Sequence, residues 1–202
     1  LKGFETVQPI YQFIKHLLKH EKELQIDNDH MMVISPDEGG MRRAVYFANV
    51  LGLDMGMFYK RRDYTKIVNG RNPIVAHEFL GSSVEGKDVI IVDDMISSGE
   101  SMLDVAKELK RRKARKVFVC ATFGLFTNGL QKFDEYYENG VIDRVLTTNL
   151  IYQSVGSALQ TVLYRRRHEQ VHCPDYRQLK PRRFLKRAVK PNGKDQPPGG
   201  EV

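Results

Sequence analysis

Residues 89–101 constrain the fold most strongly; they read Val-Ile-Ile-Val-Asp-Asp-Met-Ile-Ser-Ser-Gly-Glu-Ser. Four consecutive aliphatic residues are typical of a strand that is buried on both faces, as in a parallel sheet. The Ser-Ser-Gly that follows predicts the start of a helix, because hydroxyl side chains and glycine suit the end where backbone N–H groups lack partners. A buried strand that leads into a helix is the repeating unit of a parallel α/β fold.

The rest of the chain repeats this alternation of strands and helices. Short apolar runs predict strands over residues 31–34, 55–59, 77–80, 89–92, 117–121 and 141–146. Apolar residues at helical spacing predict helices over residues 5–25, 42–51, 101–112 and 130–137. The polar stretch 60–73 contains glycine and proline and predicts a mobile loop. We therefore expect an α/β fold with a parallel sheet and helices on both faces, and a ligand site at the carboxyl ends of the strands.

The net positive charge of the chain comes from its last quarter. Residues 154–202 carry 11 Lys and Arg against 4 Asp and Glu, whereas residues 1–153 carry 21 of each, so the net charge of +7 lies in the tail. Five of the eight prolines also fall there. This composition predicts a basic, disordered tail after a balanced domain. The tail has few aromatic residues, so we expect weak, sequence-blind contact with nucleic acid and no specific nucleic-acid partner.

Composition also limits where the chain works. No apolar run approaches the roughly 20 residues that span a bilayer, so we expect no membrane partner. The chain begins with Leu1, not Met, and no charged-then-apolar segment precedes it, so we expect an internal fragment rather than a secretory precursor. Cys120 and Cys173 are too few for a disulfide framework or a zinc site. These features favour a reducing, cytoplasmic setting.

The chemistry of residues 89–101 suits a sugar phosphate. Asp93 and Asp94 end the strand, and adjacent carboxylates can accept hydrogen bonds from vicinal sugar hydroxyls. Residues 97–101, which we call the anion cradle, combine hydroxyls with the N–H groups of a helix N-terminus, an arrangement that binds phosphate. A diol site beside a phosphate site predicts a pentose phosphate ligand. The alternative is a strand end with an ordinary helix cap.

The whole pattern resembles the phosphoribosyl-diphosphate (PRPP) motif of type I phosphoribosyltransferases and PRPP synthetases. Other segments resemble the synthetases in particular: Ser-Pro-Asp-Glu-Gly-Gly at 35–40 with Arg43 and Ala44 after it, Tyr-Lys-Arg-Arg at 59–62, residues 122–129, and Thr148-Asn149. The resemblance extends over about residues 31–153. It implies a type I phosphoribosyltransferase-like fold, with a C-terminal synthetase domain over residues 1–153 and a separate tail over residues 154–202.

The resemblance implies a ribose-phosphate diphosphokinase, which transfers the diphosphoryl group of ATP to the 1-hydroxyl of ribose 5-phosphate and gives PRPP and AMP. The partners would be ATP, ribose 5-phosphate and further copies of the chain, and the cofactor would be Mg²⁺. Asp37 would bind the metal, and Lys60 and Arg62 would be catalytic. Ribose 5-phosphate would bind to Asp93, Asp94, Ser97, Ser98, Gly99, Glu100 and Ser101.

Three departures keep other functions open. Glu100 stands where the motif has a small residue, and a carboxylate there opposes phosphate unless it points away. Phe123 stands where many synthetases have histidine. The chain resembles only the second half of the family, so we expect the N-terminal half to be missing. The alternatives are a non-catalytic regulatory subunit and a phosphoribosyltransferase that consumes PRPP.

The genetic code offers another explanation of the tail, namely a shift in the reading frame. A shift of one nucleotide in the reading frame over residues 165–191 permits a peptide with an amphipathic helical pattern. That peptide resembles the terminal helix of the synthetases. We therefore favour a shifted reading frame, in the gene or in its sequencing, over a basic binding arm.

Overall fold

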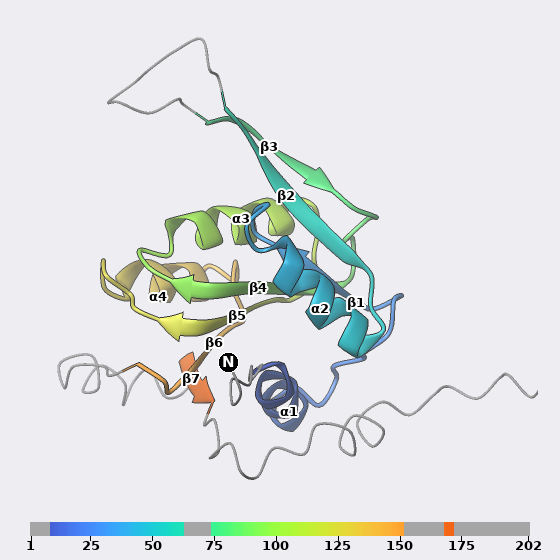
Figure 1. The fold of residues 1–202 in the computed structure, drawn as a ribbon, viewed down its shortest axis with the longest axis horizontal. Helices are drawn as coiled ribbons and strands as arrows, with labels where there is room; N and C mark the ends of the chain where they lie inside the picture. Colours follow the sequence, from blue (N-terminus) through green and yellow to red (C-terminus); the bar gives the residue numbers. More distant parts are fainter. Residues whose placement is uncertain (1–8, 63–73, 152–167, 172–202) are drawn as a thin grey trace, which may run out of the picture.

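The computed structural model describes residues 9–62, 74–151 and 168–171, which form one sheet flanked by helices (Figure 1). Seven strands lie in the order β3-β2-β1-β4-β5-β6-β7. Their bounds are β1 Met31–Ser35, β2 Met55–Arg62, β3 Ile74–Leu80, β4 Asp88–Ile96, β5 Val117–Gly124, β6 Arg144–Thr148 and β7 His168–Val171. All neighbouring strands are parallel except β2 and β3. The expected α/β fold with a mainly parallel sheet is confirmed.

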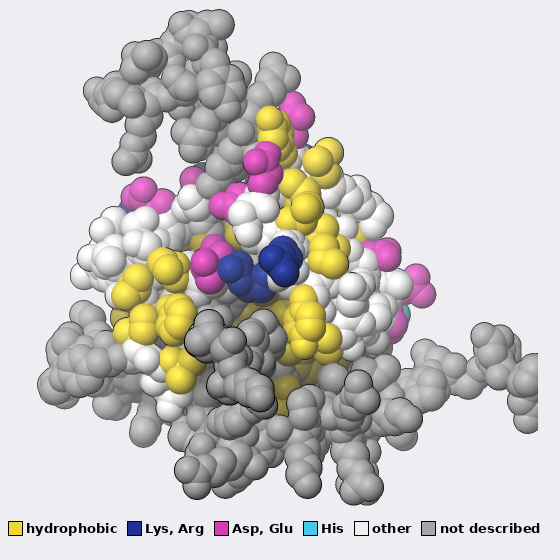
Figure 2. Space-filling model, viewed as in Figure 1, with side chains coloured by type: hydrophobic (Ala, Val, Ile, Leu, Met, Phe, Trp, Pro, Cys, Tyr) yellow, Lys and Arg dark blue, Asp and Glu magenta, His cyan; other side chains and the backbone are white. Residues whose placement is uncertain are grey.

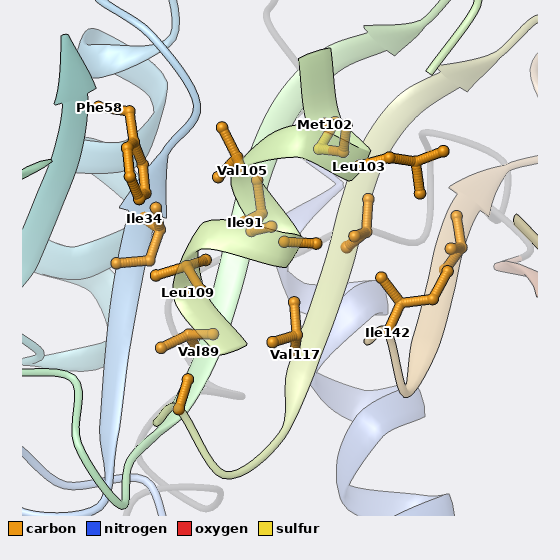
Figure 3. Packing of buried hydrophobic residues seen from close by; sticks show 14 of the residues in the cluster. Ile34, Phe58, Val89, Ile91, Met102, Leu103, Val105, Leu109, Val117 and Ile142 are labelled. Carbon is orange, nitrogen blue, oxygen red and sulfur yellow. The ribbon is translucent and has the colours of Figure 1, made fainter. Parts of the chain in front are cut away.

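The helices cover both faces of the sheet because the strands are apolar on both sides. Along β4, Ile90 and Val92 pack with α1 (Ile10–His20) and α2 (Met41–Leu51), on one face. The alternate residues Val89 and Ile91 pack with α3 (Glu100–Arg111) and α4 (Gln131–Glu138) on the other. Figure 3 shows α3 side chains against this second face. This two-sided burial matches the continuous apolar run in the sequence.

The first described helix, α1, ends earlier than the helix predicted over residues 5–25. It extends from Ile10, directly after Pro9, to His20. Residues 5–8 of that prediction lie outside the described part of the chain. Beyond its end, the Glu21 carboxylate contacts Lys116 Nζ at 2.7 Å and Arg144 Nε at 2.6 Å. These two ion pairs connect the residue after α1 to Lys116, just before β5, and to Arg144 at the start of β6.

The expected loop over residues 60–73 was wrong at its start, because β2 continues to Arg62. Its backbone pairs antiparallel with β3, with Lys60 opposite His77 and Arg62 opposite Ile74. A partner strand satisfies the N–H and C=O groups that a loop would leave to water. Residues 63–73 lie outside the described part of the chain.

A short strand also occurs within the segment that we expected to be a disordered tail. Residues 168–171 form β7, which pairs parallel with β6. At these four positions the backbone is ordered by the sheet edge, which no local pattern in the sequence indicates. The other tail positions, 154–167 and 172–202, lie outside the described residues, as does the region assigned to a shifted reading frame apart from β7.

No helix among the described residues is long and apolar enough to cross a membrane.

On the face seen in Figure 2, basic side chains lie at the middle with an acidic side chain beside them, and hydrophobic side chains flank them. This face shows mixed charge rather than a broad basic surface.

Candidate functional site

The candidate site lies where the strand order reverses. From β1 the chain proceeds to β2 on one side, whereas β4, later in the sequence, lies on the other side of β1. At such a point the loops after two neighbouring parallel strands diverge and leave a crevice. Here the loops after β1 and β4 enclose a pocket of about 360 Å³. Its lining is Asp37, Gly39, Gly40, Arg43, Asp93, Asp94, Met95, Ile96, Ser97, Ser98, Gly99, Ser101 and Met102.

The pocket brings together two sets of predicted residues from distant parts of the sequence. Asp37 comes from the loop after β1, while Asp93 and Asp94 lie near the end of β4. Of the anion cradle, Ser97, Ser98, Gly99 and Ser101 line the pocket. The carboxylate pair and most of the cradle therefore share one cavity, as a ligand with a diol and a phosphate requires.

Arg43 joins the two carboxylates and was not among the predicted site residues. Its Nη1 lies 3.3 Å from Asp93 Oδ1, and its Nη2 lies 3.3 Å from Asp94 Oδ2. The guanidinium thus bridges both aspartates from the first turn of α2. A signal existed in the sequence, since Arg43 follows the Ser-Pro-Asp-Glu-Gly-Gly segment, but only the fold places it 3.3 Å from Asp93, which is 50 positions away.

The two aspartates differ in their tendency to ionise. Burial, followed by the neighbouring Asp94 carboxylate, raises the pKa of Asp93 to about 6. Burial by itself would also raise the pKa of Asp94, but the hydrogen bond with Asp93 and the charge of Arg43 outweigh it, so the pKa of Asp94 is lowered. Asp94 therefore holds its negative charge more firmly, and Asp93 is the member of the pair that takes up a proton first.

The anion cradle needs glycine at one position. Gly99 has φ +82°, a conformation that residues with a Cβ rarely adopt. A Cβ on Gly99 would also lie 2.2 Å from Cζ of Phe133, a fully buried residue of α4. The chain can therefore turn at Gly99 into α3. The unpaired N–H groups of the first turn of α3 lie at the end of the helix that borders the pocket.

Glu100, which was predicted to bind ribose 5-phosphate, is not part of the pocket lining. Its Oε1 accepts a hydrogen bond from Lys132 Nζ at 2.9 Å. This hydrogen bond and the charge of Glu100 raise the pKa of Lys132. The Glu100 carboxylate thus pairs with Lys132, whereas its backbone N–H stays with the cradle and donates to Ser98 Oγ at 3.5 Å.

The loop after β1 holds Asp37 at the pocket by short local contacts. Gly40 N donates to Asp37 Oδ1 at 3.0 Å, and Ser35 Oγ donates to the Asp37 carbonyl at 2.7 Å. A Cβ on Gly40 would lie 2.8 Å from Ser35 Oγ, so this tight turn requires glycine.

The described residues contain no group of three or more His, Cys, Asp or Glu side chains that could hold a metal. A carboxylate such as Asp37 fits Mg²⁺, which proteins bind through one or two carboxylates together with substrate phosphates.

The two predicted catalytic residues are placed only by their backbone. Lys60 and Arg62 lie on β2, and the register pairs Met57 of β2 with Ser35 at the end of β1. The segment 60–62 therefore extends beyond the carboxyl end of β1, which is the edge of the sheet that carries the pocket. Their side chains lie outside the described part of the structure. Phe123 lies on β5 opposite Met95, next to the end of β4.

Comparisons with known proteins agree with this architecture. The family model of the phosphoribosyl transferase domain matches residues 2–158. The ribose-phosphate pyrophosphokinase of Mycoplasma genitalium is 38% identical over 124 residues, which is 61% of this chain and 35% of that protein. The enzyme of that name from Thermotoga maritima is 36% identical over 140 residues, 69% of this chain and 40% of that protein. The chain thus spans well under half of these curated relatives.

A solved structure shows the same fold. The crystal structure of phosphoribosylpyrophosphate synthetase from Mycobacterium smegmatis superposes with a TM-score of 0.55 at 22% sequence identity. The match covers 78% of this chain and 51% of that one. The expected type I phosphoribosyltransferase-like fold is confirmed.

Proposed function

Because this chain belongs to the phosphoribosyl transferase domain family, we propose that it binds ribose 5-phosphate in the pocket between β1 and β4 and serves in PRPP synthesis. One observation carries this proposal: a carboxylate pair and most of the anion cradle line the same cavity of about 360 Å³. The similarity to enzymes named ribose-phosphate pyrophosphokinase selects ribose 5-phosphate among the pentose phosphates.

In this proposal, Asp93 and Asp94 accept hydrogen bonds from the vicinal hydroxyls of the ribose. The hydroxyls and N–H groups of Ser97, Ser98 and Ser101 bind its 5-phosphate, and the dipole of α3 favours the negative charge. Arg43 keeps the two carboxylates together before the sugar binds, because its guanidinium offsets their mutual repulsion. The sugar is thereby oriented by both of its ends.

The proposed reaction is a diphosphoryl transfer. The ribose 1-hydroxyl oxygen forms a bond to the β-phosphorus of ATP, its proton is released, and the bond between that phosphorus and the oxygen leading to the α-phosphate breaks, leaving AMP. Lys60 and Arg62 would stabilise the charge on the transferring group. Asp37 would hold Mg²⁺, which when bound neutralises phosphate charge. As further proposals, the chain works in the cytoplasm and associates with copies of itself.

Calorimetric titration with ribose 5-phosphate tests the binding step, and formation of AMP and PRPP from ATP tests the transfer. We expect saturable binding that the double variant Asp93→Asn, Asp94→Asn loses. Because the chain spans 35% and 40% of the two curated relatives, the two steps are measured separately. Absence of ribose 5-phosphate binding would overturn the proposal.

Two alternative functions use the same pocket. A phosphoribosyltransferase is favoured by the family model itself, and it would consume PRPP only when a nucleobase is added. A regulatory subunit would bind ribose 5-phosphate without forming AMP, and it would change the rate of an added PRPP synthetase. The same assays, run with nucleobases and with such an enzyme, distinguish these cases.

A further inference from the structure

We propose that Lys132 is a positioning residue for the anion cradle, because its ion pair holds the Glu100 carboxylate away from the phosphate that binds there. This inference rests on the proposed function and adds a residue of α4 to the site. It also gives a reason why this chain tolerates a carboxylate at a position where the motif has a small residue.

The position of Glu100 creates a conflict that the pair resolves. Glu100 is the first residue of α3, so the helix N-terminus attracts its carboxylate as it attracts a bound phosphate. Two anions at one helix end repel each other. The neighbours Gly99 and Ser101 line the pocket but Glu100 does not, and its Oε1 lies 2.9 Å from Lys132 Nζ instead.

The backbone that carries Lys132 is fixed by the next residue in the chain. Phe133 is fully buried and its ring packs where a Cβ of Gly99 would otherwise be. Phe133 also makes an edge-to-face contact with Phe126, with ring centroids 5.3 Å apart. Because these contacts fix α4 next to the cradle, the backbone of Lys132 has a fixed position close to Glu100.

The expected effect is on phosphate affinity and not on folding. The side chains of Lys132 and Glu100 are both 58% exposed, and exposed ion pairs add little to stability. Charges at a helix N-terminus change the binding of an anion there by modest amounts. Loss of the Lys132 cation should therefore weaken phosphate binding by about two- to fivefold at low salt.

The experiment is a titration of the full chain with ribose 5-phosphate, inorganic phosphate and ribose. The variants are Lys132→Ala, Lys132→Arg, Glu100→Gln and the double variant Lys132→Ala, Glu100→Gln. Lys107→Ala is the matched control, since it removes one exposed lysine from α3 about two turns beyond Glu100. Thermal melting of every variant checks that each one folds.

We expect Lys132→Ala to weaken binding of both phosphate ligands about two- to fivefold, with ribose unchanged and with the difference smaller at about 0.5 M salt. Lys132→Arg should bind phosphate ligands like the unaltered chain. When Glu100→Gln is already present, adding Lys132→Ala should cause less than about half of the loss in affinity that it causes alone. Lys107→Ala should bind like the unaltered chain.

Three results would overturn the inference. An unchanged affinity in Lys132→Ala would show that Glu100 does not oppose phosphate. An equal loss with and without Glu100→Gln would show that Lys132 acts on the phosphate directly. Failure of the unaltered chain to bind ribose 5-phosphate would overturn both the inference and the proposed function. The first two results would overturn the inference alone, because the unaltered chain would still bind ribose 5-phosphate.

Discussion

The ring of Phe133 lies directly behind Gly99, so close that a Cβ on the glycine would be 2.2 Å from the ring carbon Cζ. Real Cβ atoms do not approach this closely, because van der Waals repulsion is steep at that distance. Gly99 also has φ +82°. The shape of the anion cradle is thus set by its own backbone and by a buried side chain of α4.

Gly99→Ala should damage both folding and phosphate binding. We expect a loss of about 1–3 kcal/mol in the free energy of unfolding, because the new methyl group must displace Phe133 and the backbone is strained at positive φ. Affinity for ribose 5-phosphate should fall more than about tenfold as the cradle moves. Chemical denaturation and calorimetry measure the two effects.

Gly86→Ala is the matched control for that variant. Gly86 also has positive φ, at +74°, but nothing lies within 4 Å of the position of its Cβ. It should lose only about 1 kcal/mol and bind ribose 5-phosphate normally. Equal behaviour of the two variants would mean that contact with Phe133 does not matter.

Asp93→Asn and Asp94→Asn should separate recognition of the sugar from recognition of the phosphate. Each change removes a charged acceptor for the ribose hydroxyls, and hydrogen bonds to charged groups contribute about 1.5–3 kcal/mol. We expect ribose 5-phosphate to bind at least about tenfold more weakly, while inorganic phosphate binds no more weakly than before. An equal loss of affinity for both ligands would contradict the assignment of Asp93 and Asp94 to the ribose hydroxyls.

The raised pKa of Asp93 predicts how stability changes with pH. The pKa in the folded state is about 6, above the ordinary value of 3.8, so the folded chain holds this proton more tightly than the unfolded chain does. Ionised Asp93 therefore opposes folding at neutral pH, and this cost disappears as pH falls from above 6 towards 4. Asp94 acts in the opposite direction, but its pKa is lowered, so its contribution is lost only at more acidic pH.

Melting temperatures as a function of pH check this sign. Asp93→Asn should be more stable than the unaltered chain at pH 7.5, by on the order of 1 kcal/mol, since the amide can still accept the hydrogen bond from Asp94 N. The difference should shrink as pH falls through about 6. A constant difference across this range would show that Asp93 does not titrate there.

Lys60→Ala should affect transfer far more than binding. In the assay for AMP and PRPP formation, we expect kcat to fall about a hundredfold or more, because the lysine charge would act on the transferring group. The Kd for ribose 5-phosphate should change by less than about threefold. Arg61→Ala removes the neighbouring charge, to which we assign no role, and an equal loss in both variants would make Lys60 an ordinary surface cation.

Several contacts that complete the site could not be predicted from the sequence. Arg43 is 50 positions from Asp93, and Lys132 is 32 positions from Glu100. Each pair joins residues of two different elements that meet only in the folded chain, α2 with β4 and α3 with α4, and the local spacing of residues does not identify the partner. The pairing of β2 with β3 and the addition of β7 likewise depend on free sheet edges, which arise only once the sheet exists.

The sequence by itself indicated the alternation of strands and helices up to β6, the burial of β4 on both faces and the position of Asp93 and the anion cradle after a buried strand, because apolar periodicity, glycine and helix-start residues act over a few neighbouring positions. Asp37 was expected from the resemblance to PRPP synthetases rather than from such a local pattern. Only the tertiary structure decided that these loops enclose one pocket, that Arg43 bridges the carboxylates and that Glu100 turns to Lys132. These features depend on the packing of segments far apart in the chain, where distance and charge, rather than local pattern, select the partner.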